Sequence, residues 1–126
     1  MNNVMKQLVN NGCLGIKTSF EDEGVKLNKA YTLRNITKEY GMKLALKIGG
    51  PEAKTDFMNA LEIGADSIVG PMIESGYAAK KFVNMAHNFD TNLGINIETI
   101  QAITNIDDIL HVSDYVDYFV IGRVDL

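Results

Sequence analysis

The sequence has little of what several classes of protein require. It contains one cysteine, Cys13, so no disulfide can form within the chain, and a secreted, disulfide-stabilised fold is not expected. Its apolar runs are far shorter than the roughly 20 residues that cross a bilayer. The N-terminal residues 1–6 contain no apolar signal core. These features together predict a soluble, cytoplasmic protein.

An excess of basic residues is also missing. The 12 Lys and Arg residues against 16 Asp and Glu residues give a net charge of −4. Nucleic acids and anionic membranes attract basic surfaces, so we expect neither as a partner. The 126 residues, of which 46% are hydrophobic, are enough for one packed core. We therefore expect a single domain over residues 1–126.

Short apolar runs alternate with segments of helical spacing. The predicted strands are residues 14–20, 43–48, 67–72, 94–97 and 118–124. Apolar residues at every third or fourth position predict helices near residues 1–10, 30–40, 53–61, 78–86 and 104–110. Pro51 is expected in a first helical turn, and residues 104–107 resemble a capping box that begins the last helix. Strands joined by crossover helices predict a parallel α/β sheet.

The predicted strands carry polar groups on one face. In the first, second and fourth strands this face holds Lys17, Lys47, Asn96 and Glu98. In the last strand we place on it Phe119, Ile121, Arg123 and Asp125. A doubly wound sheet is apolar on both faces, whereas a barrel has helices outside only and polar groups inside, near its active site. The pattern favours a (β/α) barrel segment with about five of the eight strands of a TIM barrel.

Two alternatives to a barrel stay open at this point. The lysines can reach solvent or pair with neighbouring acids, and a five-stranded flavodoxin-like sheet has about this length. A full barrel takes about 250 residues, roughly twice this chain. We therefore expect the N-terminal part of a barrel, with exposed sheet edges and an incomplete site. Whether this part is active or inactive on its own stays open.

Two carboxylates stand at the ends of predicted strands. Glu98 and Asp125 follow the fourth and fifth strands, one βα unit apart. Neighbouring strands lie about 4.8 Å apart, so both side chains can reach one ion. Carboxylate oxygens suit Mg²⁺ or Mn²⁺, and the sequence therefore predicts a divalent metal site. His87 and His111 each stand alone, and we expect no role for them in metal binding.

Candidate anion-binding groups follow the second strand. Lys47 precedes Gly49 and Gly50, and a helix is predicted directly after them, so a carboxylate or phosphate can meet a positive charge and free amides. A Gly-Gly pair before a helix is also common as a plain turn. Further candidates at strand ends have other roles: Glu74 is a predicted substrate ligand, and Glu21, Glu23 and Arg123, with Lys47, are predicted catalytic groups. The acidic turn at residues 21–23 either supplies a general base or is simply solvated.

Five segments together carry the motifs of a known kind of enzyme. They are residues 15–24, 47–53, 64–75, Asn96-Ile-Glu-Thr99 and Val120-Ile-Gly-Arg-Val-Asp-Leu126. They resemble the aldolase/citrate lyase family of the phosphoenolpyruvate/pyruvate-type barrels. The resemblance implies that Glu98 and Asp125 bind Mg²⁺ or Mn²⁺. It implies a carbon–carbon lyase that acts on a pyruvate-, oxo-acid- or acyl-type substrate through a metal-stabilised enolate. We expect a small anionic substrate as partner, and a homo-oligomer.

The sequence departs from that family at two places. Lys47 stands where relatives usually have an arginine that binds the substrate carboxylate, and a lysine loses the bidentate geometry. No histidine follows the first strand, so Glu21 or Glu23 must replace the base of the acid–histidine pair. Other functions stay open: a receiver-like signalling module, which expects a lysine and an aspartate near Arg123 and Glu74, or a non-catalytic oligomerising fragment.

Overall fold

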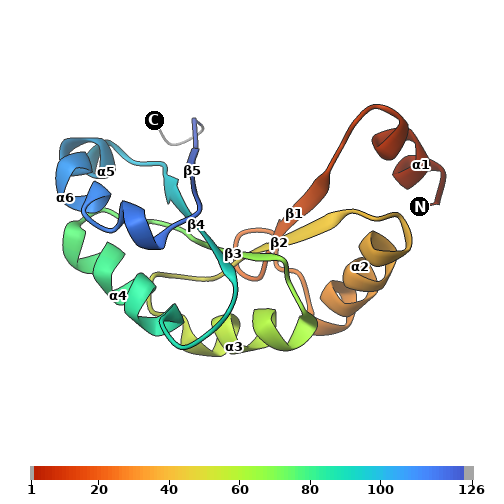
Figure 1. Ribbon diagram of the computed structural model, residues 1–126, viewed down its shortest axis with the longest axis horizontal. Helices are drawn as coiled ribbons and strands as arrows, with labels where there is room; N and C mark the ends of the chain where they lie inside the picture. Colours follow the sequence, from red (N-terminus) through yellow and green to blue (C-terminus); the bar gives the residue numbers. More distant parts are fainter. Residues whose placement is uncertain (1, 124–126) are drawn as a thin grey trace.

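A single curved sheet of parallel strands, with helices along its outer side, forms the protein (Figure 1). This computed structural model describes residues 2–123. The strands are β1 (Gly15–Ser19), β2 (Lys43–Lys47), β3 (Ser67–Gly70), β4 (Asn92–Ile97) and β5 (Tyr118–Ile121). The helices are α1 (Asn2–Asn10), α2 (Leu27–Glu39), α3 (Lys54–Ile63), α4 (Gly76–Ala86), α5 (Ile100–Thr104), α6 (Ile106–Leu110) and the 3-10 helix η1 (Ser113–Tyr115). No helix within residues 2–123 is long and apolar enough to span a membrane.

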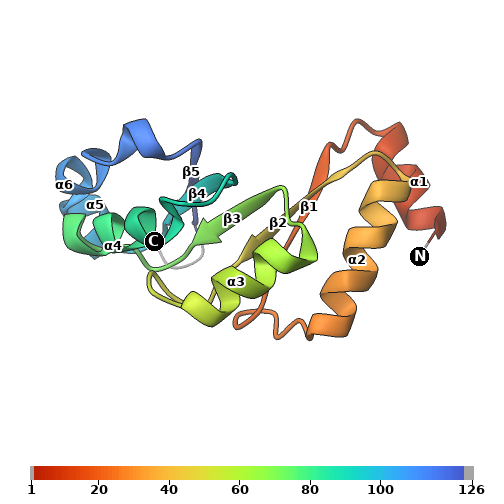
Figure 2. The same ribbon diagram turned by 60° about the horizontal axis from the view of Figure 1, so that its bottom comes forward.

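The order of the strands decides between the architectures left open by the sequence. They follow one another as β1-β2-β3-β4-β5, and every neighbouring pair is parallel. A flavodoxin-like sheet has the order 2-1-3-4-5, so that alternative is wrong. Figure 2 shows α2, α3 and α4 following one another around the outside of the sheet. The fold is a curled half-barrel, and the predicted barrel segment is confirmed.

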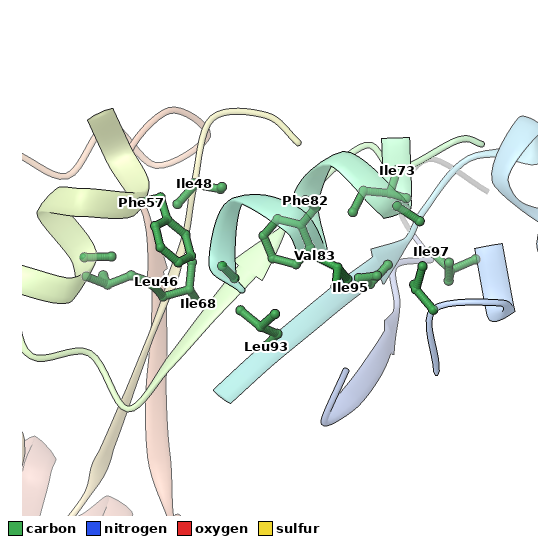
Figure 3. Close-up of a cluster of buried hydrophobic side chains, with 14 of the residues drawn as sticks. Leu46, Ile48, Phe57, Ile68, Ile73, Phe82, Val83, Leu93, Ile95 and Ile97 are labelled. Carbon is green, nitrogen blue, oxygen red and sulfur yellow. The ribbon is translucent and has the colours of Figure 1, made fainter. Parts of the chain in front are cut away.

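The core lies between the outer face of the sheet and the helices. Leu46, Ile68 and Leu93 are neighbours in the strand register and form one apolar row across β2, β3 and β4. Phe57 of α3 and Phe82 of α4 cover this face and are fully buried (Figure 3). Each such side chain contributes about 1.5–3 kcal/mol when it leaves water. Lys47 and Asn96 alternate with these core residues along β2 and β4, and they therefore belong to the other face of the sheet.

The predicted start of the third helix is wrong. α3 begins at Lys54, and Pro51 lies in the turn before it rather than in a first helical turn. The Ala53 amide donates to the Gly50 carbonyl, which closes this turn. The turn takes the place of a helical start, so the chain after β2 reaches α3 through irregular backbone.

The predicted capping box at residues 104–107 is also wrong. Thr104 ends α5, and its hydroxyl donates to the Ile100 carbonyl. Thr99 caps α5 instead, because its hydroxyl oxygen accepts a hydrogen bond from the Ala102 amide at 3.1 Å. A second helix, α6, does begin near the expected place, but its cap position is Asn105, one residue after Thr104, and no side chain caps it.

The prediction that Phe119 and Ile121 lie on the polar face of the last strand is wrong. The register places Phe119 and Ile121 beside the outward-facing isoleucines of β4, and Phe119 packs against the buried core. Tyr118 faces inward, with its hydroxyl 2.7 Å from the Ser67 hydroxyl of β3. The strand ends at Ile121, so strict alternation does not reach Arg123. Aromatic and branched residues occur on both faces of β5, and only pairing with β4 sets its orientation.

Candidate active site

A cavity of about 360 Å³ lies at the carboxyl ends of the strands. Its lining includes Glu21, Asp22, Lys47, Gly49, Met72 and Glu98. These residues come from the carboxyl end of β2 and from the turns after β1, β2, β3 and β4, which parallel pairing brings to the same end of the sheet. The volume suits a small molecule, and this edge is where barrel enzymes carry their active sites. The cavity is therefore the candidate site.

Glu98 is held in place from two sides. Its residue is 9% exposed. One carboxylate oxygen accepts a hydrogen bond from the Met72 amide at 2.9 Å, and the other accepts from the Asn96 side-chain amide at 3.0 Å. Each carboxylate oxygen has a second acceptor direction. Glu98 is thus oriented by the protein and still has acceptor capacity for a ligand.

The groups around Glu98 suit a hard cation in part. Asn96 is 3% exposed, and its side-chain oxygen has no hydrogen-bond partner among the described residues. Carboxylate and amide oxygens are ligands that Mg²⁺ accepts, usually with several waters. Within residues 2–123, no group of three or more His, Cys, Asp or Glu side chains is placed to hold a metal. Asp125, the second predicted ligand, lies outside the described residues, so the metal site stays a prediction.

Lys47 forms an ion pair with the acidic turn after β1. Its ammonium lies 2.7 Å from an Asp22 carboxylate oxygen. The Lys47 side chain is 11% exposed and that of Asp22 is 67% exposed. The hydrogen bond and the charge of Lys47 hold the pKa of Asp22 below its ordinary value. A nearly buried cation therefore faces the cavity, where it can meet an anionic ligand.

The structure separates the two candidate bases in the acidic turn. The Thr18 hydroxyl donates to the Glu23 carboxylate at 2.6 Å, and the Glu23 amide donates to the Ser19 hydroxyl at 2.7 Å. These contacts tie Glu23 to the end of β1. Glu21 lines the cavity, and Glu23 is not part of its described lining. Glu21 is the better placed of the two to reach a substrate.

The glycines after β2 have a different role from the one expected. The Gly49 amide donates to the Asp56 carboxylate at 2.8 Å and is not free for an anion. A Cβ atom at Gly49 would lie 2.7 Å from the Glu21 side chain, so glycine at this position lets the Glu21 side chain lie close to the backbone of the turn. Gly50 has open space around it and does not line the cavity within the described residues. Lys47 is left as the anion-binding candidate of this turn.

Two predicted site residues lie away from the cavity lining in the described part of the chain. The Glu74 carbonyl accepts a hydrogen bond from the Asn105 side chain at 2.8 Å, and its carboxylate is not part of the lining. Arg123 is exposed and follows the end of β5. Their predicted roles as a substrate ligand and a catalytic group therefore gain no support from position.

Sequence reasoning missed two residues that shape the site. Met72 has a φ of 51°, in the left-handed region that residues other than glycine rarely adopt, and its amide points at Glu98. Gly122 approaches Glu98 so closely that a Cβ atom there would lie 2.8 Å from the Glu98 Cβ. A glycine at the end of a strand was a usable signal for Gly122. Nothing in the sequence marks the backbone conformation of Met72.

Comparisons with known proteins agree with this architecture. The citrate synthase SbnG superposes with a TM-score of 0.85 at 15% identity, covering 100% of this chain and 58% of that one. An HpcH/HpaI aldolase from Desulfitobacterium hafniense DCB-2 gives 0.77 at 17% identity, covering 95% and 57%. An HpcH/HpaI aldolase/citrate lyase family protein from Burkholderia cenocepacia J2315 gives a TM-score of 0.80 at 12% identity, covering 97% of this chain and 60% of that one. The chain thus spans less than two thirds of these structures.

The sequence itself supplies the family. A search of curated protein sequences gives no match. The sequence profile described as HpcH/HpaI aldolase/citrate lyase matches residues 26–126, which is most of the chain and includes β2 to β5 with Lys47 and Glu98. The structural likenesses are too low in identity to show more than the fold, but the profile match covers far more than half of the sequence. The chain belongs to the HpcH/HpaI aldolase/citrate lyase family.

Proposed function

We propose that this chain forms part of the active site of a divalent-metal-dependent carbon–carbon lyase acting on a pyruvate-, oxo-acid- or acyl-type substrate. Family membership supports a lyase-type function. The observation that carries the finer proposal is the cavity at the strand ends, which joins a nearly buried cation, an acid at its rim and an oriented carboxylate. The three groups come from separate parts of the chain, and the parallel strand order brings them to one cavity.

Lys47 is the proposed carboxylate-binding residue. Its ammonium faces the cavity from the end of β2, and its stem is held in the sheet. Low exposure strengthens its attraction for an anion, because less water screens the charge. Lysine acts as a point charge, so it binds one carboxylate oxygen without fixing the plane of the group.

Glu98 is the proposed metal ligand, together with Asp125. The two hydrogen bonds to Glu98 fix the direction of its carboxylate, as partners of metal ligands commonly do. Mg²⁺ bound there would supply Lewis-acid stabilisation of negative charge on a carbonyl oxygen. Glu21 is then the proposed base, which takes a proton from the carbon next to that carbonyl.

Hydrogen exchange of pyruvate tests this proposal. Glu21 removes a proton from the methyl carbon, the electron pair moves toward the carbonyl oxygen, and return of a deuteron from D₂O erases the methyl signal in proton NMR. The residues proposed for this half-reaction are Lys47, Glu98 and Glu21, with Asp125 as the second metal ligand. We expect exchange with Mg²⁺ present, and a loss of about 100-fold or more in Glu21→Gln.

The variant Glu23→Gln is the matched comparison for the base. It removes one negative charge from the same turn, at a carboxylate that accepts a hydrogen bond from the Thr18 hydroxyl. We expect it to retain exchange. Exchange that survives in Glu21→Gln and disappears in Glu23→Gln would reverse the assignment of the base. A wild-type chain that exchanges no faster with Mg²⁺ than buffer alone would contradict the proposed function.

A further inference from the structure

We propose that Asp22 is an internal competitor for the anion site, because its carboxylate occupies the position on Lys47 that an anionic substrate must take. The substrate would then bind by displacing Asp22 from the ammonium. This inference rests on the proposed role of Lys47. It deepens that role by naming the residue that sets the affinity of the site.

The chemistry of the pair carries the first step. The Asp22 carboxylate is the same group as the carboxylate of an oxo acid, and it already lies 2.7 Å from the Lys47 ammonium. Both residues line the cavity. Asp22 is the one ion-pair partner that Lys47 has among the described residues. The cation that would attract a substrate is therefore engaged by a substrate-like group of the protein itself.

The charges around the cavity carry the second step. Glu21, Asp22 and Glu98 bring three carboxylates to the lining, whereas Lys47 is its one cation among the described residues. Another carboxylate placed beside Asp22 would share one positive charge with a like charge, which is unfavourable. An anion gains most from Lys47 after Asp22 has left, since departure both frees the ammonium and moves a negative charge away.

Asp22 can leave without disturbing the turn. Its side chain is 67% exposed, and Lys47 is its one hydrogen-bond partner in the described structure. The turn is anchored on either side, because the Phe20 amide donates to the Lys47 carbonyl and the Glu23 amide donates to the Ser19 hydroxyl. Rotation of the Asp22 side chain toward solvent therefore requires no change of backbone.

Other functions for Asp22 predict opposite results. If Asp22 positions Lys47 for the substrate, removing its charge weakens binding. If the two compete, the apparent dissociation constant equals the intrinsic one divided by the fraction of molecules in which Lys47 is free. One partner of this ion pair, Asp22, is largely exposed, and such pairs are weak. We therefore take Asp22 to hold Lys47 in a fraction of about 0.7 to 0.9 of the molecules, so removing the competitor tightens binding by about 3- to 10-fold.

Titration of pyruvate at saturating Mg²⁺, followed by amide chemical shifts of the whole chain, separates these outcomes. The test variant is Asp22→Asn, which keeps the shape of the side chain. Asp90→Asn is the control, because Asp90 is an exposed aspartate between α4 and β4, at the amino ends of the strands and not at the carboxyl ends where the site lies. It makes the same change in net charge far from Lys47. Lys47→Ala and the double variant Asp22→Asn/Lys47→Ala complete a cycle.

We expect Asp22→Asn to tighten pyruvate binding by about 3- to 10-fold, Asp90→Asn to leave it unchanged, and the effect of Asp22→Asn to vanish when Lys47 is alanine. Unchanged or weaker binding in Asp22→Asn, with Lys47→Ala still impaired, would overturn the competition and leave the proposed function standing. Binding unaffected by Lys47→Ala would remove Lys47 from the site, and the competition would fall with it.

Discussion

The close approach of Gly122 to Glu98 offers a test of how the site is built. The Gly122 amide donates to the Ile97 carbonyl at 2.9 Å, so the chain after β5 stays bonded to β4. In Gly122→Ala, the new methyl group would lie 2.8 Å from the Glu98 Cβ. Carbon atoms normally sit about 3.5–4.0 Å apart, so one side must yield by roughly 1 Å.

The cost of that shift follows from the contacts of Glu98. Moving its Cβ atom strains the hydrogen bonds to the Met72 amide and the Asn96 side chain, at 2.9 and 3.0 Å. Overpacking of this kind destabilises proteins by about 1–3 kcal/mol. For a domain of this length, each 1 kcal/mol lowers the melting temperature by about 3–6 °C. We also expect Mg²⁺ affinity to fall, because the carboxylate no longer keeps its direction.

Thermal unfolding by circular dichroism and Mg²⁺ calorimetry measure the two effects. Gly50→Ala is the control for stability, because no atom lies within 4 Å of the Cβ it would add and its φ is not in the left-handed region. We expect Gly50→Ala to change stability by less than about 0.5 kcal/mol. A Gly122→Ala chain with unchanged melting temperature and unchanged Mg²⁺ affinity would refute the packing argument.

Two further predictions concern the ion pairs. Asp66→Asn leaves the nearly buried Arg34 guanidinium without its partner and weakens the bond to the Leu44 amide, so urea unfolding should show a loss of about 2–3 kcal/mol. Burial raises the pKa of Asp66, but the Leu44 amide and Arg34 outweigh it and set that pKa below its ordinary value. The stabilisation by Asp66 is therefore full above about pH 4 and is lost as the pH falls through the lower folded pKa. The free energies of unfolding of wild type and Asp66→Asn should converge in acid. A difference between them that grows in acid would contradict this sign. Lys47→Ala should lose pyruvate affinity with its melting temperature kept within a few degrees, and a chain that fails to fold would show that Lys47 is structural instead.

Periodicity in the sequence favoured the barrel segment, and the strand order then excluded the flavodoxin-like alternative. Apolar residues such as Leu44 and Leu46 alternate with Lys43 and Lys47 in β2, and this period of two survives in the structure because one face is buried under helices. β5 carries apolar residues on both faces, and its orientation depends on pairing with β4, which no local pattern records. Long-range pairing therefore decided what local sequence left open.

Some features of the candidate site could be predicted from the sequence, and others could not. Lys47 and Glu98 stand at strand ends, and parallel pairing brings them to one cavity, so their sequence positions were informative. The bond between Asp22 and Lys47 depends on the path of a turn, and the contact between Met72 and Glu98 depends on an unusual φ. Neither follows from residue type or spacing. Turn conformations are set by contacts across the sheet, which explains why these features required a structure.

Binding of Mg²⁺ by the Glu98 carboxylate is the central claim. Isothermal calorimetry with Mg²⁺ tests it most directly, on wild type, on Glu98→Gln and on Glu62→Gln, a control with the same chemical change at an exposed position of α3. The account predicts saturable heats for wild type and Glu62→Gln and their loss in a folded Glu98→Gln chain. Equal heats in all three proteins, or none in wild type, would contradict it.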